Sequence, residues 1–385
     1  MSSARAKQIS TPQRARGGRS APHGQRETRD PAEFLDPLTL SRKEGWRAYV
    51  EAPQQEQPDR LSTRQIRSLS PEAAEEYNER RSVWHANFGS IQTANVRAAT
   101  REIRLFVKSN QQRSRLKPAL ALTGLPGLGK TELVNSYAKQ FHRQRISRYG
   151  EFTSSGAERW PACRIGMTGI TGVKEFNWAF LNFYAHPGRG TTDNFLAQAQ
   201  DLVRECNTEL LIIDDLHFLR GQYPKVTHLS NQFKYIAENL GVTIIFIGIG
   251  LDERAALIDD QGSYESHEMD QLLWFTKKVK FSKYETRSVA GKNDWHHLLL
   301  TIEQLLVLAN NRPGMLVGDL SSYLHDRSDG HIGSLMTLLR LGCQYAIEDG
   351  SERITKKLLD TFEIDSAAEL GRRQLATKRR TASAK

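Results

Sequence analysis

Residues 124–131 constrain the fold of this chain more than any other segment. They read Gly-Leu-Pro-Gly-Leu-Gly-Lys-Thr, a complete G-x-x-x-x-G-K-[ST] pattern. The uncharged apolar stretch 118–123 before them predicts a buried parallel strand, and the apolar spacing over 132–141 predicts a helix. A glycine loop between a strand and a helix start aims main-chain N–H groups at phosphate oxygens. This context favours a phosphate-binding loop over a chance match, and it predicts that the chain binds a nucleoside triphosphate.

Each part of the loop has an expected role. The glycines permit the backbone angles that turn successive N–H groups inward. Lys130 is expected to reach the β- and γ-phosphates during catalysis, and the Thr131 hydroxyl to be a ligand of Mg²⁺, so the expected cofactors are ATP and Mg²⁺. The predicted nucleotide-binding residues are Gly124, Leu125, Pro126, Gly127, Leu128, Gly129, Lys130 and Thr131.

A second buried strand is predicted over 209–215, where four aliphatic residues precede two aspartates. Carboxylates at the C-terminal tip of a parallel strand lie at the crevice where α/β sheets hold ligands. We expect Asp214 to belong to the Mg²⁺ shell and Asp215 to orient the attacking water as a catalytic residue. The alternative is that the pair forms a solvated turn at the strand end.

The net charge of +10 is concentrated at the two ends of the chain. Residues 1–30 hold seven Lys and Arg against two acidic residues, and residues 371–385 hold six against none, so the remainder carries −1. Both ends are polar and poor in large apolar side chains, which predicts disorder. Basic tails of this kind either bind phosphates through counterion release or serve only as solubilising segments.

Composition excludes some classes of protein. No run approaches eighteen consecutive apolar residues, and the N-terminus has no apolar signal region, which predicts neither a membrane span nor a secretory signal. Cys163, Cys206 and Cys343 are widely separated, as expected of buried thiols in a reducing cytoplasm. The sequence therefore predicts a cytoplasmic protein without a membrane partner.

Strands and helices alternate through the middle of the chain. Further strands are predicted over 162–167 and 242–248, the latter being the last, and helices over 173–184, 195–206 and 226–240. This alternation predicts an α/β fold, a parallel sheet covered by helices. Four helical patterns follow, over 295–308, 320–325, 332–347 and 355–362. The predicted domains are a disordered basic tail (1–39), a helical N-terminal adaptor (40–100), a P-loop ATPase domain (101–286), a helical lid domain (287–365) and a basic C-terminal tail (366–385).

This order of segments resembles the AAA+ ATPases and, within them, the TniB/TnsC type of transposition ATPase. The resemblance covers about residues 60–365. Besides the loop, it depends on Tyr-Asn-Glu-Arg at 77–80, Ile-Ile-Asp-Asp-Leu-His-Phe-Leu at 212–219, and Gly-His-Ile-Gly-Ser-Leu at 330–335. Many such ATPases carry a glutamate where this chain has Asp215, which is one methylene shorter, so slow hydrolysis is one expected consequence.

The resemblance implies an ATP-dependent, DNA-binding regulator of transposition in the bacterial nucleoid. Such proteins assemble on double-stranded DNA as rings or filaments and recruit a DDE-type transposase, and hydrolysis then remodels the assembly. Lys174 is a possible DNA contact or a solvated loop lysine. His331 is a possible lid sensor or a structural residue. Phe275 stands near the place of the family's arginine finger, and Arg254 is the nearest arginine before it.

Other functions share parts of this pattern. A replication-initiator or helicase-loader-like AAA+ ATPase has the same core but needs a DNA-reading domain. An NTP-switch signalling ATPase carries long repeats after its lid, and a small-molecule P-loop kinase needs no helical lid. We expect this chain to be an ATPase that uses ATP hydrolysis as a switch.

Overall fold

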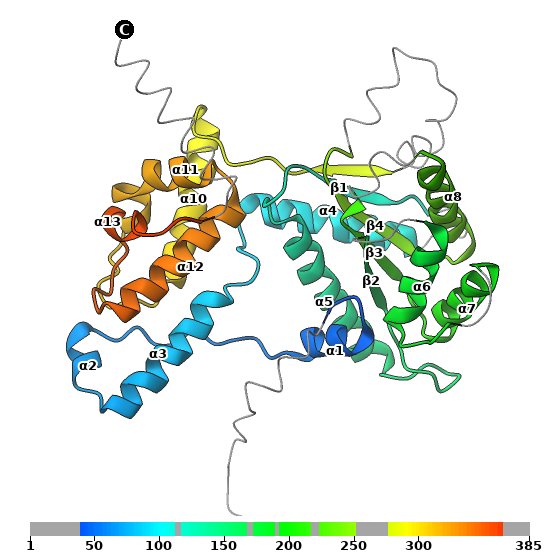
Figure 1. Ribbon diagram of the computed structural model, residues 1–385, viewed down its shortest axis with the longest axis horizontal. Coiled ribbons are helices and arrows are strands. Elements are labelled where there is room, and N and C mark those ends of the chain that lie inside the picture. The colour runs from blue at the N-terminus through cyan, green and yellow to red at the C-terminus, as the bar shows by residue number, and fades with distance from the viewer. Residues whose placement is uncertain are drawn as a thin grey trace, which may run out of the picture. The chain divides into compact units, whose positions relative to one another are not determined.

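In the computed structural model, one five-stranded parallel sheet organises the larger part of the chain (Figure 1). The structure describes residues 39–111, 117–167, 172–188, 192–216, 223–251 and 276–364. The strands are β1 (Leu120–Thr123), β2 (Ala162–Gly166), β3 (Leu210–Asp214), β4 (Thr243–Gly248) and β5 (Lys277–Lys280). Their order is β2-β3-β4-β1-β5, so β4 lies between the strand before the glycine loop and the strand that ends in the aspartates.

The predicted strands form because their residues are apolar on both faces. Every residue of β1, β3 and β4 is buried, as expected for a parallel sheet covered on both sides. The prediction that 242–248 is the last strand is wrong, because β5 follows it and pairs with β1. Three of the four residues of β5 are lysines and only Val279 is buried, so this edge strand has no apolar pattern to reveal it.

Helices surround the sheet in two groups of contacting elements. One group contains α1 (Lys43–Glu51), α4 (Ala94–Gln111) and α5 (Lys130–Tyr149). The other contains α6 (Val173–Phe183), α7 (Thr192–Glu205) and α8 (Tyr223–Asn239). Figure 1 shows α4 and α5 on one side of the strands and α6, α7 and α8 on the other. The α/β prediction of a parallel sheet covered by helices is confirmed.

A second hydrophobic cluster is formed by helices that follow the sheet, the predicted lid. These are α10 (Val289–Leu305), the short π-helix η4 (Met315–Asp319), α11 (Ser321–Ser328), α12 (Ile332–Glu348) and α13 (Lys356–Leu359). The fully buried side chains at its centre include Trp295, Leu316, Leu335 and Leu339. No helix of the described residues is long and apolar enough to span a membrane.

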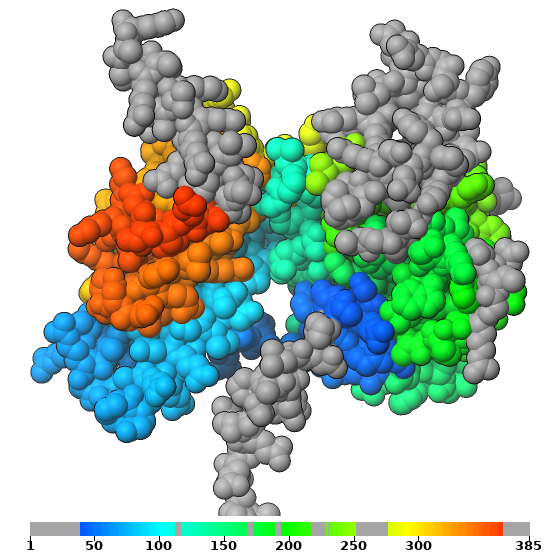
Figure 2. Space-filling view, in the orientation of Figure 1, coloured from blue at the N-terminus to red at the C-terminus, as the bar shows by residue number. Residues whose placement is uncertain are grey.

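The segment predicted as an adaptor contributes to both clusters. Trp46 and Val50 of α1 are buried in the cluster around the sheet, where Figure 2 shows this segment in dark blue against the green surface. In contrast, α2 (Thr63–Arg67) and α3 (Pro71–Ala86) lie beside the lid helices, and α3 contacts α12. Ser70 caps α3 by accepting a hydrogen bond from the Ala73 N–H, and Pro71 occupies the first helical position.

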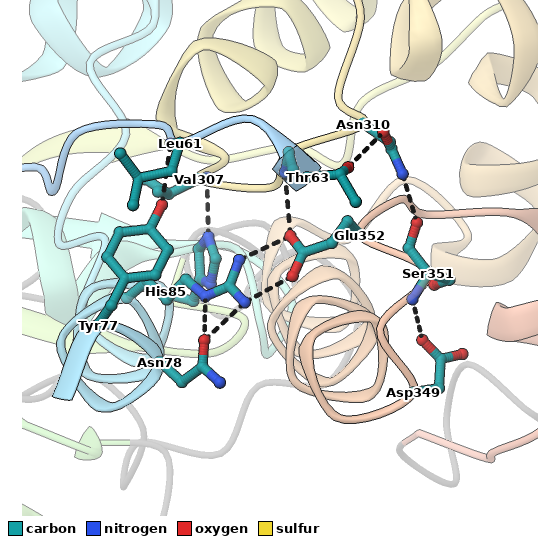
Figure 3. Close-up of polar contacts among 12 residues, drawn as sticks. Leu61, Thr63, Tyr77, Asn78, His85, Val307, Asn310, Asp349, Ser351 and Glu352 are labelled. Atoms are coloured by element: carbon teal, nitrogen blue, oxygen red, sulfur yellow. Dashed lines mark hydrogen bonds and ion pairs between the residues drawn. The ribbon is translucent and has the colours of Figure 1, made fainter. Parts of the chain in front are cut away.

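A buried ion pair joins α3 to the segment between α12 and α13 (Figure 3). Arg81 donates from Nη1 and Nη2 to the two carboxylate oxygens of Glu352, each at 2.6 Å, and both side chains are almost completely buried. Four residues further along α3, His85 Nε2 accepts a hydrogen bond from the Val307 N–H at 3.0 Å. These contacts link residues more than 200 positions apart in the sequence, so no local pattern could have indicated them.

Candidate functional site

The glycine loop leaves the tip of β1 and enters α5 through backbone conformations that favour glycine. Gly124, Gly127 and Gly129 have φ of 146°, 69° and 80°. At Gly124 a Cβ atom would lie 2.4 Å from the carbonyl oxygen of Phe281, at the end of β5, so no other residue fits there. Gly129 is the residue before the first turn of α5, whose unpaired N–H groups therefore open toward the loop. The loop has the geometry of a phosphate cradle.

Lys130 begins α5 and is 7% exposed. Its Nζ donates to the carbonyl oxygens of Gly124 (2.9 Å) and Leu125 (2.6 Å), so the ammonium lies inside the loop. Burial lowers the pKa of Lys130, while the negative charges of Asp214 and Asp215 oppose that shift. The structure therefore brings the lysine and both predicted acidic residues to one place.

Asp214 ends β3 and lies beside the first turn of α5. The carboxylate is buried, and its Oδ1 accepts a hydrogen bond from Thr131 Oγ1 at 3.3 Å. The two residues are 83 positions apart in the chain. A hydroxyl and a carboxylate oxygen side by side next to a phosphate cradle are the hard oxygen ligands that Mg²⁺ prefers. The residues present therefore fit a Mg²⁺ ion brought by a nucleotide.

Asp215 follows directly in the left-handed backbone region, with φ of 61°. Its N–H donates to Asp214 Oδ1 at 2.9 Å, and it is half-buried at the strand tip. The left-handed conformation is uncommon for a residue other than glycine and often marks a functional position.

Sequence reasoning missed Arg164, which lies in β2 next to the acidic strand. Its Nη2 contacts the second oxygen of Asp214, Oδ2, at 2.6 Å. The available signal was one arginine in the middle of an otherwise apolar strand, a position where a charge needs a partner.

The lid contacts the loop through main chain rather than through the predicted sensor. The N–H of Gly333, in the first turn of α12, donates to the Gly127 carbonyl at 2.8 Å, and a Cβ at position 333 would lie 3.0 Å from that oxygen. Ile332 approaches Gly129, the last glycine of the loop. His331 immediately precedes these residues and is half-buried. This close approach of two backbones, which a Cβ at position 333 would crowd, was not anticipated from the sequence.

The other predicted residues lie away from these contacts or outside the described ranges. Lys174 is exposed in the first turn of α6, after the end of β2. Arg254 and Phe275, considered for an arginine finger, lie outside the described residues, as do both predicted tails except Thr39. Within the described ranges, no group of three or more His, Cys, Asp or Glu side chains could hold a metal ion by itself.

Comparison with known proteins gives a match to one family over part of the chain and a similar fold. Residues 86–266 match the family described as bacterial TniB protein, and no curated protein matches the sequence. Among solved structures, the Aeropyrum pernix ORC2 protein (ADPNP-ADP complexes) is similar at a TM-score of 0.51 and 13% identity, covering 73% of this chain and 71% of that one.

Two further structures are similar at lower scores. The Aeropyrum pernix ORC1 protein in complex with DNA gives a TM-score of 0.49 at 14% identity, covering 73% of this chain and 68% of that one. Drosophila ORC bound to DNA gives 0.49 at 11% identity, covering 82% and 70%. The similarity to ORC2 supports the predicted AAA+ fold.

Proposed function

We propose that this protein is an ATP-hydrolysing switch that regulates DNA transposition, because residues 86–266 match the TniB family and the glycine loop has the geometry of a phosphate cradle. The observation that carries the ATP site is the contact between Thr131 Oγ1 and Asp214 Oδ1 at 3.3 Å, next to the loop. It unites the loop and the acidic strand in the arrangement that a Mg²⁺–triphosphate needs.

The roles of the residues follow from their positions. The N–H groups of the loop and of the first turn of α5 bind the β- and γ-phosphates, and Lys130 turns from the loop carbonyls toward the same oxygens. Thr131 and Asp214 would hold Mg²⁺, which neutralises charge on the phosphates when bound. Asp215, at the open tip of β3, orients the attacking water. The ORC2 protein, which has a similar fold, is described in complexes with ADPNP and ADP, and this supports the proposal that a nucleotide binds at the glycine loop.

The contact between lid and loop gives the switch a structural basis. Gly333 donates to Gly127, a residue of the loop that would surround the phosphates. Binding or loss of the γ-phosphate at the loop would therefore change a hydrogen bond to α12 directly. In many nucleotide switches, segments that contact the γ-phosphate are ordered while it is bound and become disordered after hydrolysis, and this transition drives the conformational change.

The match to the TniB family supports the finer proposals about partners. In this proposal the protein assembles as a homo-oligomer on double-stranded DNA in the bacterial nucleoid and recruits a DDE-type transposase. The basic ends, residues 1–30 with net +5 and 371–385 with net +6, would bind DNA phosphates, while the rest of the chain carries −1. Lys174 on α6 is a further proposed DNA contact, exposed as that role requires.

The replication-initiator alternative shares the fold, and similarity to ORC2 at 13% identity shows only that fold. The match of residues 86–266 to the TniB family favours transposition.

The experiment that tests the proposal measures ATP binding and hydrolysis separately, with DNA present. Lys130→Ala should lose ATP binding, whereas Asp215→Asn should bind ATP, lose turnover and accumulate an ATP-bound oligomer on DNA. Lys108→Ala, at an exposed position on α4, is the matched control. Normal binding and hydrolysis by Lys130→Ala would overturn the site. If the addition of DNA and transposase changes neither the oligomeric assembly nor the rate of ATP hydrolysis, the transposition role fails while the ATP site stands.

A further inference from the structure

Arg164 lies on the face of β2 that points toward the predicted metal site. In the parallel register, Arg164 pairs with Ile212 and Gly166 pairs with Asp214. Since side chains alternate between faces along a strand, Arg164 and Asp214 lie on the same face. The guanidinium spans the two-residue offset and reaches the carboxylate at 2.6 Å.

The two oxygens of Asp214 are divided between two sets of partners. Oδ1 faces the loop, where it accepts from Thr131 Oγ1 and from the Asp215 N–H. Oδ2 faces Arg164. The carboxylate is 3% exposed and the arginine side chain 14% exposed, so water screens this ion pair poorly. The oxygen that faces the loop stays available to a metal, while the charge of the group is already balanced.

The N-terminal segment holds the arginine in place. Nη1 of Arg164 donates to Ser41 Oγ at 3.3 Å, and Ser41 precedes α1, which packs on α5. Within the described residues, Arg164 Nε is buried without a hydrogen-bond partner. A buried N–H group without a hydrogen-bond partner costs free energy, so the ion pair between Arg164 and Asp214 must offset that cost.

We propose that Arg164 is a positioning residue that acts as an internal counter-ion of Asp214 and thereby restricts the metal site to metal that arrives with a nucleotide. Without nucleotide, the carboxylate already has a cation, and a divalent ion gains little by approaching it. With ATP bound, the phosphates add the negative charge that a divalent ion needs. This inference rests on the proposed ATP site, because it concerns the same carboxylate.

Coulomb's law gives the direction and scale of the effect. Removing the guanidinium leaves a buried carboxylate without its cation, so a divalent ion becomes its most favourable partner. A guanidinium and a divalent ion several ångströms apart repel each other strongly even at an effective dielectric constant of about 20. After partial solvation of the vacated space, the affinity for a divalent ion should rise at least about tenfold.

The test titrates the full-length, nucleotide-free protein with Mn²⁺ and follows free Mn²⁺ by electron paramagnetic resonance. Arg164→Met should bind Mn²⁺ at least about tenfold more tightly than the wild type. Arg164→Gln, which restores a polar side chain without charge, should behave in the same way and serves if the methionine variant does not fold. The double change Arg164→Met, Asp214→Asn should return to the wild-type affinity and so locate the added site.

One control distinguishes an effect of the charge of Arg164 from an effect of its size. A second control tests the proposed ATP site independently of the counter-ion role. Arg164→Lys keeps the charge and should stay within about threefold of the wild type. An unchanged affinity in both uncharged variants would overturn the inference, as would a lysine variant that shifts as far as the methionine variant. Wild-type protein titrated with Mn²⁺ in the presence of a non-hydrolysable ATP analogue tests the ATP site itself. If the analogue promotes no Mn²⁺ binding, the proposed function fails first.

Discussion

Neutralising Glu352 should loosen the lid while leaving the sheet intact. Glu352 accepts both 2.6 Å hydrogen bonds of Arg81 and a third from the Ala309 N–H at 3.0 Å. The two side chains of the ion pair are 1% and 5% exposed. Glu352→Gln keeps the shape but leaves the guanidinium charged, because arginine does not release its proton in proteins. Removing one partner of a buried pair costs about 3–5 kcal/mol.

Hydrogen–deuterium exchange measures this cost locally. Peptides covering α3, α12 and residues 305–311 should lose at least about 100-fold in protection, because each 1.4 kcal/mol is a factor of ten. Peptides covering β1, β3 and β4 should keep theirs, since these strands belong to the other hydrophobic cluster.

An exposed ion pair in the same part of the chain provides the matched control. Arg312 and Asp319 lie 3.9 Å apart and are 75% and 66% exposed, so Arg312→Met should change stability by less than about 1 kcal/mol. Changing both buried partners, Arg81→Met with Glu352→Gln, should recover part of the loss, because no uncompensated charge remains. A loss below about 1 kcal/mol in Glu352→Gln, or an equal loss in the strands, would refute the reasoning.

Three further predictions concern acid stability, the loop and the basic ends. Burial lowers the pKa of His85 and of His142 to about 4 in the folded protein. In the unfolded chain these histidines keep a pKa of about 6.5, so the unfolded state binds protons first as the pH falls and folding becomes less stable. Thermal unfolding scans should show stability constant above pH 7 and lower by about 2 kcal/mol per histidine at pH 5, and a flat profile would contradict this. Gly124→Ala should abolish ATP binding in equilibrium dialysis because its Cβ meets a main-chain oxygen at 2.4 Å, and normal binding would show that the loop can shift. Deleting residues 1–30 and 371–385 should preserve ATP hydrolysis and flatten the salt dependence of DNA binding, whereas an unchanged slope would assign DNA binding to the rest of the chain.

The parts of the fold that the sequence predicted are those with a local pattern. The glycine loop, the four buried strands and most helices combine apolar periodicity with glycine or capping residues, and each pattern occupies about twenty positions or fewer. The contact between Thr131 and Asp214 was also predictable, because a parallel sheet brings strand tips to one edge. The residues of the predicted ATP site could therefore be identified from short segments of the sequence.

The features that escaped prediction depend on contacts distant in sequence. β5 lacks an apolar pattern, and it forms because β1 has an open edge beside it. Gly333 looked like part of a helix start, yet its N–H contacts a loop more than 200 residues earlier. Arg164 is an unusual residue in a buried strand, but only the register of β2 against β3 shows which carboxylate it meets.

The segment before α4 connects the features that the proposed switch requires. Ser41 holds the arginine that pairs with Asp214, and α1 packs on α5, the helix that carries the glycine loop. Farther along the same segment, Arg81 of α3 is tied to Glu352 of the lid. The lid in turn contacts the loop through Gly333. A change at the loop therefore has two physical routes to this segment, one through the carboxylate of Asp214 and one through the lid. A partner that binds the segment would act on the proposed ATP site along the same two routes, because coupling between sites is reciprocal.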